Sequence, residues 1–144
     1  MKAPREITAA AARRIWLHAQ RLDTRTPFGD GPEATRRAVA HLGYVQIDTI
    51  NVIERCHHHI LFTRIPGYRR TDLSTAQAGD KSVFEYWTHA LSYVPTSDLP
   101  FYLPAMKRHQ ADPSQWYANA DPAELAKMMR RIRTDGPIDP RGGR

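Results

Sequence analysis

An amide and a carboxylate lie two residues apart at Gln46 and Asp48. If Tyr44 to Asp48 is extended, successive side chains point to opposite faces, so these two polar groups project together. Val45 and Ile47 then point into a core. The spacing therefore predicts a pair of polar side chains that could hold a water molecule between them.

Asp48 has a second interpretation, because aspartate often caps a helix that follows a strand. Asn51 is better placed for that task, and with Glu54 three residues later it forms a capping-box pattern. The pattern predicts a helix from about Val52 to Arg64, ended by Pro66 and Gly67. Its expected inward residues are Ile53, Cys56 and Ile60, joined by Leu61 and Phe62, and its expected outward residues are Arg55, His58 and Arg64.

Two helices are expected before this motif. Thr8 can cap the first, over about Thr8 to Leu22, where apolar residues recur at three- and four-residue spacing and form one stripe. After a loop over Asp23 to Gly31, Pro32 opens the second helix, and Gly43 sits where a left-handed terminator is expected. The residues of the second helix expected to face inward are Thr35, Ala38, Val39 and Leu42.

After the motif, Val83 to Trp87 has strand composition, and Ala90 to Val94 could return beside it as a wing-like hairpin. Asp72 to Ala78 is expected to be a short helix, and Ser97 to Gln110 a longer one that its prolines confine or kink. A last helix begins after Asp121, whose side chain can cap it before Pro122. The expected fold class is mainly α with a small β component.

The composition favours an acidic partner. The 144 residues suit one domain, carry a net charge of +6, and include 17 arginines among 21 basic residues. Arginine suits bidentate phosphate contacts, so nucleic acid is the expected partner, with a compositional bias as the alternative. Cys56 is the single cysteine of the sequence, which excludes an internal disulfide and fits a reducing compartment. No secretory signal and no apolar run of about 18 residues is found, so no membrane partner and a cytoplasmic location are expected.

Three consecutive histidines, His57, His58 and His59, raise the question of a metal site. Consecutive residues of a helix lie about 100° apart, so the three cannot converge on one ion. We therefore expect no metal and no cofactor. One or two of these histidines are expected to pack beside Gln46 and Asp48 or to touch DNA phosphate.

The sequence segments LGYVQIDTINVIERCHHHILFTRIPGY and VFEYWTHALSYVP closely resemble the YcaQ-like crosslink-repair DNA glycosylases, relatives of AlkZ. The resemblance covers most of residues 7 to 136. The family signature is Gln, an apolar residue, then Asp. The resemblance implies a winged-helix-like fold and double-stranded DNA with alkylated bases as the partner. It also implies that Gln46 and Asp48 are the catalytic residues.

The implied reaction is hydrolysis of the N-glycosidic bond of N7-alkylated purines, with interstrand crosslinks as a further candidate substrate. A purine alkylated at N7 is already cationic and leaves as a neutral molecule, so a second carboxyl group acting as general acid is unnecessary. Gln46 would orient the water, and Asp48 would accept its proton or face the cationic sugar.

Several other residues are candidates for DNA contact. Glu85, Trp87 and His89 alternate along the expected hairpin; core packing is the favoured interpretation, and a lesion-facing role of Trp87 or His89 is the alternative. A solvated charged face is equally compatible with the basic residues. The candidates are Arg55, His57, His58, His89, Lys107, Arg108, Arg130 and Arg131.

Family members are several times longer, with tandem winged-helix units and a β-rich C-terminal part. Residues 1–120 are thus expected to be an N-terminal winged-helix-like region, and residues 121–144 the truncated start of a further unit. The full-length protein is expected to be a monomer associated with the nucleoid. The alternatives to a glycosylase are a winged-helix DNA-binding module without enzymatic activity and an inactive truncated gene product.

Overall fold

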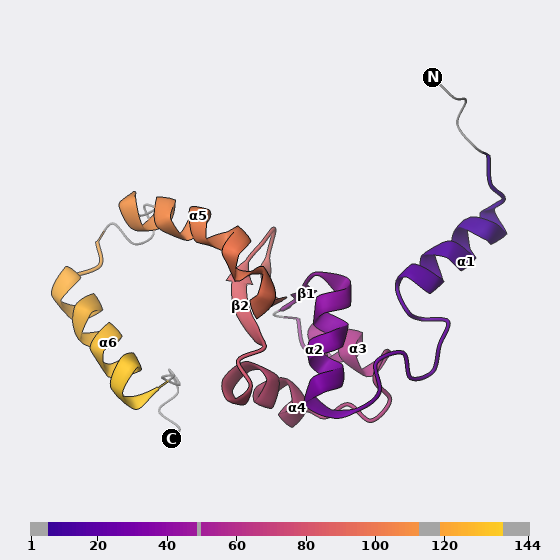
Figure 1. Cartoon of the computed structure of the whole chain (residues 1–144), viewed down its shortest axis with the longest axis horizontal. Helices are drawn as coiled ribbons and strands as arrows, with labels where there is room; N and C mark the ends of the chain where they lie inside the picture. The colour runs from indigo at the N-terminus through magenta and orange to yellow at the C-terminus, as the bar shows by residue number, and fades with distance from the viewer. Residues whose placement is uncertain (1–5, 49, 113–118, 137–144) are drawn as a thin grey trace. The chain divides into compact units, whose positions relative to one another are not determined.

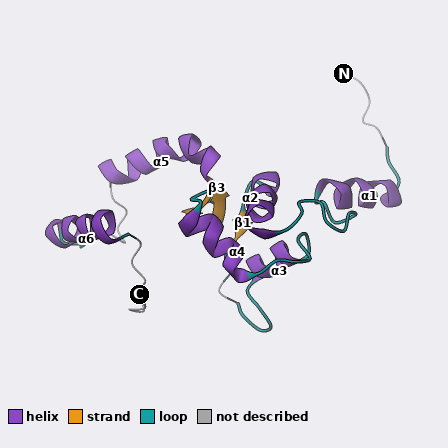
Figure 2. Ribbon diagram, turned by 60° about the horizontal axis from the view of Figure 1, so that its bottom comes forward, coloured by secondary structure: helices purple, strands orange, loops and turns teal. Residues whose placement is uncertain are grey.

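The computed structural model describes residues 6–48, 50–112 and 119–136. The chain divides into two compact units, Met1–Asp98 and Leu99–Arg144, which are described separately. Helices dominate both units, and a small antiparallel sheet lies in the first (Figures 1 and 2). The expected fold class, mainly α with a small β component, is confirmed.

The elements of the described residues follow in a simple order. The first unit contains α1 (Ala9–Ala19), α2 (Gly31–Leu42), β1 (Val45–Gln46), α3 (Cys56–Phe62), α4 (Arg70–Ser74), the π-helix η1 (Thr75–Gly79), β2 (Val83–Trp87), β3 (Leu91–Pro95) and the short 3-10 helix η2 (Thr96–Asp98). The second unit contains α5 (Leu99–Ala111) and α6 (Pro122–Asp135).

The sheet has the strand order β1-β3-β2, and both pairings are antiparallel. Its β2-β3 hairpin is the expected one, although the second strand begins at Leu91 rather than at Ala90. The turn contains no glycine and is closed by Thr88, whose N–H and hydroxyl both donate to the carbonyl of Ala90, at 3.0 and 3.1 Å. A side chain thus provides the closure that glycine often makes possible.

The core lies where α2 contacts β3, α4 and η1. Small residues on α2 let these elements approach closely, and the expected inward face is confirmed, with Leu42 only partly buried. Gly43 follows α2 with φ of +80°, a conformation that favours glycine, so the expected terminator is also confirmed. The buried residues of α2 are Ala34, Thr35, Ala38 and Val39.

Helix α1 is attached to the rest of the unit at its carboxyl end. Its expected cap is confirmed, since the Thr8 hydroxyl accepts the N–H of Ala11 at 3.1 Å. The helix ends at Ala19, before the expected Leu22, and none of its residues is buried. Side chains from other parts of the unit donate hydrogen bonds to the carbonyls at this end. His41 donates to the main-chain oxygen of Ala19, and Arg64 donates to that of Gln20.

The expected start of the third helix is wrong. Helix α3 begins at Cys56, with Arg55 as its first flanking residue, and residues 50–55 form a loop. Asn51 lies in this loop and caps no described helix, and the Glu54 carboxylate is engaged elsewhere: it accepts the N–H of Arg55 at 2.9 Å and forms an ion pair with Arg70. A side chain held in this way cannot reach back to close a capping box.

Three assignments of inward and outward faces are also wrong. Phe62, expected inward, is 58% exposed. Ile53, expected inward, is 87% exposed because it lies in the loop and not on the helix. Arg64, expected outward, is buried because its guanidinium donates to the carbonyl and side-chain oxygens of Gln20, at 3.0 and 3.2 Å. These bonds compensate the burial of the charge.

The second unit begins with α5, which contains Pro104 in its interior, so the expected helix with prolines is confirmed. Asp121 caps α6 by accepting the N–H of Ala123 at 2.9 Å, with Pro122 at the first helical position, as expected. The winged-helix units stay a prediction, and Pro137 and Ile138 of the expected further unit lie outside the described residues. No helix in the described part of the chain has both the length and the apolar character needed to span a lipid bilayer.

Candidate functional site

The Gln46 segment is positioned by the sheet. Strand β1 is shorter than expected, but the pairing continues one residue further, where the N–H of Ile47 donates to the carbonyl of Leu91 at 2.8 Å. Val45 is 1% exposed, and Ile47 is partly buried against the core, so both apolar residues face inward as expected. Asp48 is therefore the first residue beyond the paired strand.

Gln46 lies opposite Ser92 of β3, while Val45 lies opposite the buried Tyr93. Because cross-strand partners share a face, Gln46 projects on the other side of the sheet from Val45. Gln46 is half-buried and does not line the cavity that Asp48 borders. The common face of Gln46 and Asp48 stays a prediction.

Asp48 is half-buried at the beginning of the loop that follows β1. Its Oδ1 accepts the N–H of Ile50 at 3.0 Å, while its Oδ2 forms no hydrogen bond with the described residues. This bond fixes the carboxylate at the edge of an open, largely apolar cavity of about 310 Å³. The other residues that line it are Ile50, Val52, Ile53, Glu54, Cys56 and His59.

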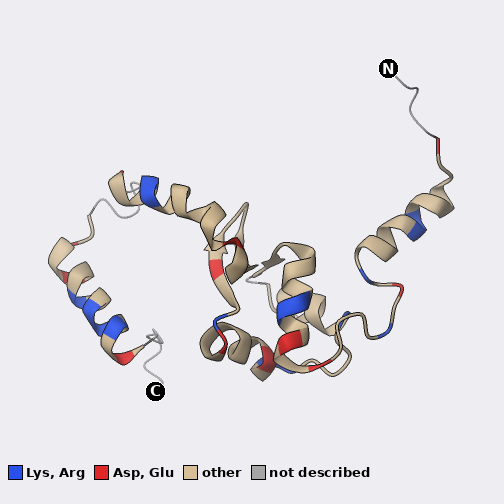
Figure 3. Ribbon diagram, in the orientation of Figure 1, with Lys and Arg blue, Asp and Glu red and all other residues tan. Residues whose placement is uncertain are grey.

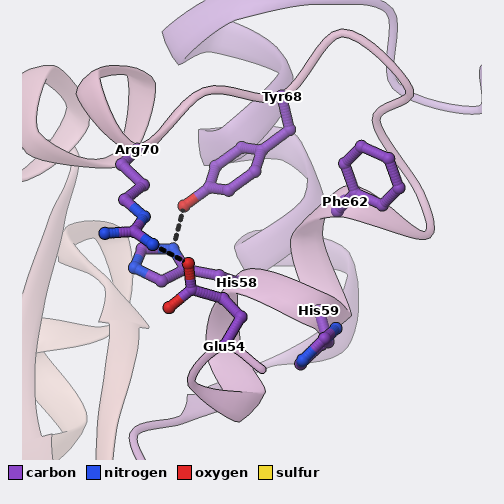
Figure 4. Close-up of a pocket in the computed structure, with 6 residues that line it drawn as sticks. All are labelled: Glu54, His58, His59, Phe62, Tyr68 and Arg70. Carbon is purple, nitrogen blue, oxygen red and sulfur yellow. Dashed lines mark hydrogen bonds and ion pairs between the residues drawn. The ribbon is translucent and has the colours of Figure 1, made fainter. Parts of the chain in front are cut away.

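A second cavity of about 320 Å³ is bordered by polar and aromatic side chains (Figure 4). It shares Glu54 and His59 with the first cavity, so the two are neighbours. Glu54 and Arg70 point toward each other and form an ion pair, and His58 Nδ1 lies 2.7 Å from the Tyr68 hydroxyl. Phe62 completes its lining.

The charges around these cavities follow from the contacts. The N–H of Arg55 lowers the pKa of the Glu54 carboxyl below its usual value, and Arg70 lowers it further, so Glu54 is anionic at neutral pH. Burial lowers the pKa of His58 and raises that of Tyr68, which keeps both side chains neutral. The wall shared by the two cavities therefore carries the Glu54 carboxylate, whose negative charge is paired with the guanidinium of Arg70.

His57 belongs to the core behind the site and not to its surface. It is 4% exposed, and its ring packs on His58 and Tyr93, with centroids 4.1 and 5.5 Å away. Burial lowers its pKa to about 4, so the ring is neutral at pH 7, and its Nδ1 has no hydrogen-bond partner among the described residues. This position suits packing better than contact with phosphate. In the described ranges, no three His, Cys, Asp or Glu side chains gather as metal ligands.

The hairpin turn lies beside the residue that precedes β1. His89 makes an edge contact with Tyr44, with ring centroids 5.2 Å apart. Trp87 is 68% exposed, so the expectation that it packs is wrong. Val83, at the start of β2, lies on the same face and is buried. The residues that cover this face therefore reach Val83 but do not extend to Trp87 at the end of the strand.

A model of the AlkZ-like DNA glycosylase family matches residues 39–141, well over half of the chain. The chain belongs to this family. The family resemblance inferred from the sequence segments is thus confirmed, and both Gln46 and Asp48 lie inside the matched range. No solved structure matches the chain. The AlkZ-like family is one of DNA repair glycosylases, which are hydrolases whose partner is DNA.

The basic residues that were candidates for DNA contact lie on both units of this AlkZ-like chain. Arg55 is exposed in the loop that borders the Asp48 cavity. The other Lys and Arg candidates lie on α5 and α6, where Figure 3 shows basic residues near the carboxyl end of α5 and along α6. The exposed candidates there are Lys107, Arg108, Arg130 and Arg131. Their contact with phosphate stays a prediction.

Sequence reasoning missed the residues of the second cavity. Arg70 and Tyr68 lie beyond the Pro66-Gly67 turn and were assigned no role, and Glu54 was assigned to a helix cap. An ion pair between residues 16 positions apart leaves no periodic signal. The only local hint was the pair of arginines, Arg69 and Arg70, directly after Tyr68.

Proposed function

We propose that the protein hydrolyses the N-glycosidic bond of N7-alkylated purines in double-stranded DNA, including purines joined in interstrand crosslinks. Gln46 and Asp48 are the proposed catalytic residues. The observation that carries the proposal is the position of Asp48, whose carboxylate is held by the N–H of Ile50 at the edge of an open cavity. Membership of a DNA glycosylase family supports the class of reaction.

The proposed step needs no general acid. The oxygen of the water bonds to the sugar carbon C1′ while the bond from C1′ to the base nitrogen breaks. The electron pair of the broken bond stays with the purine and neutralises its positive charge. The proton of the water passes to Asp48. Because Oδ1 of Asp48 is engaged by the N–H of Ile50, Oδ2 is the oxygen that receives it. Gln46 orients the water through its amide.

The charge of the cavity supports selection of a cationic base. Asp48 and Glu54 both line it, and the contacts of Glu54 keep that carboxyl anionic. An alkylated purine carries a positive charge that an undamaged purine lacks, so the Asp48 carboxylate attracts the damaged base selectively, whereas the charge of Glu54 is already paired with Arg70.

The test uses duplex DNA methylated at N7 of guanine. We expect the protein to release N7-methylguanine and to leave abasic sites, with release measured by chromatography of the free base. DNA retardation is measured in parallel on the same substrate. Retardation without release of the base would make the protein a DNA-binding module, and the absence of both would make it an inactive product.

A further inference from the structure

The loop Ile50–Arg55 places apolar side chains in solvent. Val52 and Ile53 are 89% and 87% exposed, the highest exposures of any large apolar side chain in the described residues. Ile50, at 67%, adds to the same stretch. Neighbouring apolar residues that stay exposed in a folded protein mark a surface that meets a partner.

The loop is held in shape at both ends by carboxylates. Asp48 accepts the N–H of Ile50 at its beginning, and Glu54 accepts the N–H of Arg55 at its end. The ion pair between Glu54 and Arg70 ties the end of the loop to α4. The apolar tip is therefore presented in a fixed form, which reduces the entropy lost when it binds.

The surroundings of the tip identify the chemistry of its partner. Arg55 follows directly in the chain and is exposed, and Arg70, which pairs with Glu54 at the end of the loop, leaves most of its side chain exposed. An apolar tip flanked by arginines matches duplex DNA, in which stacked bases lie between two lines of phosphates. Apolar side chains that enter such a stack separate base steps at a cost of a few kcal/mol.

We propose that Val52 and Ile53 form a wedge that inserts into the base stack of duplex DNA beside the base presented to Asp48. Both residues line the same cavity as Asp48, so separation of the stack by the wedge brings the glycosidic bond to that cavity. This role rests on the proposed function of the Asp48 site. The wedge positions the DNA and takes no part in the bond changes.

The test compares the double variant Val52→Ser/Ile53→Ser with the parent chain. Because both side chains are almost fully exposed, the variant retains its fold. Ile15→Ser is the matched control, since Ile15 is also β-branched and 60% exposed but lies on α1, outside the family match. Serine and isoleucine have similar helix propensities, so the control carries little helical cost.

The first measurement is the fluorescence of 2-aminopurine placed beside a tetrahydrofuran abasic-site analogue in duplex DNA. At saturating protein, the parent and the Ile15→Ser chain raise the fluorescence by unstacking the probe, and the double variant loses most of that rise. The second is single-turnover release of N7-methylguanine, which falls by about tenfold or more in the double variant.

The two measurements separate the wedge from the proposed function. A fluorescence rise in the parent and its loss in the double variant, without any release of base, supports the wedge and refutes the glycosylase reaction. Release of base at equal rates, with equal fluorescence, by parent and double variant overturns the wedge and leaves the reaction standing. Sedimentation of both chains adds a further outcome. If the parent chain forms an oligomer and the double variant is a monomer, Val52 and Ile53 form a self-association surface, and the wedge proposal is overturned.

Discussion

Valine and isoleucine occur on both sides of Asp48, and they have opposite surroundings. Val45, three residues before it, is 1% exposed, whereas Ile53, five residues after it, is 87% exposed. The first segment pairs with β3, and the second is held, among the described residues, by the carboxylates of Asp48 and Glu54. Apolar character alone therefore does not determine burial. The sheet pairing that places Val45 in the core extends only as far as Ile47.

This difference places Asp48 at a border. On one side, substitutions remove core packing and affect the stability of the fold. On the other, they change a surface that the fold does not need. Residues at such a border can be fixed by the core and still be reached by a partner, which is what a catalytic carboxylate requires.

The largest effect is expected at the border itself. Asp48→Asn keeps the shape of the side chain but removes its charge, so single-turnover release of N7-methylguanine should fall by roughly two orders of magnitude or more, with DNA affinity little changed. Gln46→Ala should slow release less, because other groups can partly hold the water. An Asp48→Asn protein that releases the base at the parent rate contradicts the assignment.

The next effect tests the buried segment. Val45→Ala removes two methyl groups from a fully buried position, so the free energy of unfolding measured in urea should fall by about 2 to 3 kcal/mol. Val52→Ala makes the same chemical change in the exposed loop and serves as its control. Equal losses in the two variants would break the comparison between the segments.

A third effect concerns the core behind β1, where His57 packs on Tyr93. Burial lowers the pKa of His57 from 6.5 to about 4, so the unfolded chain takes up the proton first as the pH falls. The contribution of His57 to stability is complete above about pH 6.5 and is lost toward pH 4, with a decrease of about 2 kcal/mol between about pH 7 and about pH 5.

His57→Phe keeps a packed ring, removes the titration and also removes the buried Nδ1 that lacks a partner. Urea unfolding at several pH values should therefore show a smaller loss of stability in this variant than in the parent. An identical pH dependence of the two proteins would mean that folding leaves the pKa of His57 unchanged.

The smallest effect is expected in the exposed loop. Val52→Ser/Ile53→Ser should change the free energy of unfolding by no more than about 0.5 kcal/mol, because neither side chain packs on the core. Thermal unfolding by circular dichroism provides the measurement. A loss comparable to that of Val45→Ala would show that the tip is covered in the folded protein.

Sequence reasoning succeeded where the cause of a structure lies within a few residues. Thr8 and Asp121 each bind an N–H two or three positions away, and the β2-β3 hairpin joins neighbouring segments. It failed where the cause is distant. Arg64 is buried by Gln20, 44 positions before it, and Glu54 is engaged by Arg70, 16 positions after it.

The candidate site shows the same division. The two-residue spacing and the family resemblance made Gln46 and Asp48 the candidate catalytic residues, an assignment that stays a prediction. The inward position of Val45 followed from alternation and is confirmed. The cavity beside Asp48 could not be predicted, because it depends on the loop that replaces the first turn of the expected helix. Trp87 was also misjudged, since the cover of one face of β2 ends before that residue.

The anchor of α1 makes the tolerance of this chain to mutation unequal. Arg64 and His41 donate to the main-chain oxygens of Gln20 and Ala19, which every amino acid possesses. Evolutionary change at residue 19 therefore leaves its bond to His41 intact, and change at residue 20 removes only the contact of Arg64 with the amide side chain. The side chains that must be kept for the anchor to persist are the two donors, His41 and Arg64, which lie far along the chain from the helix that they hold.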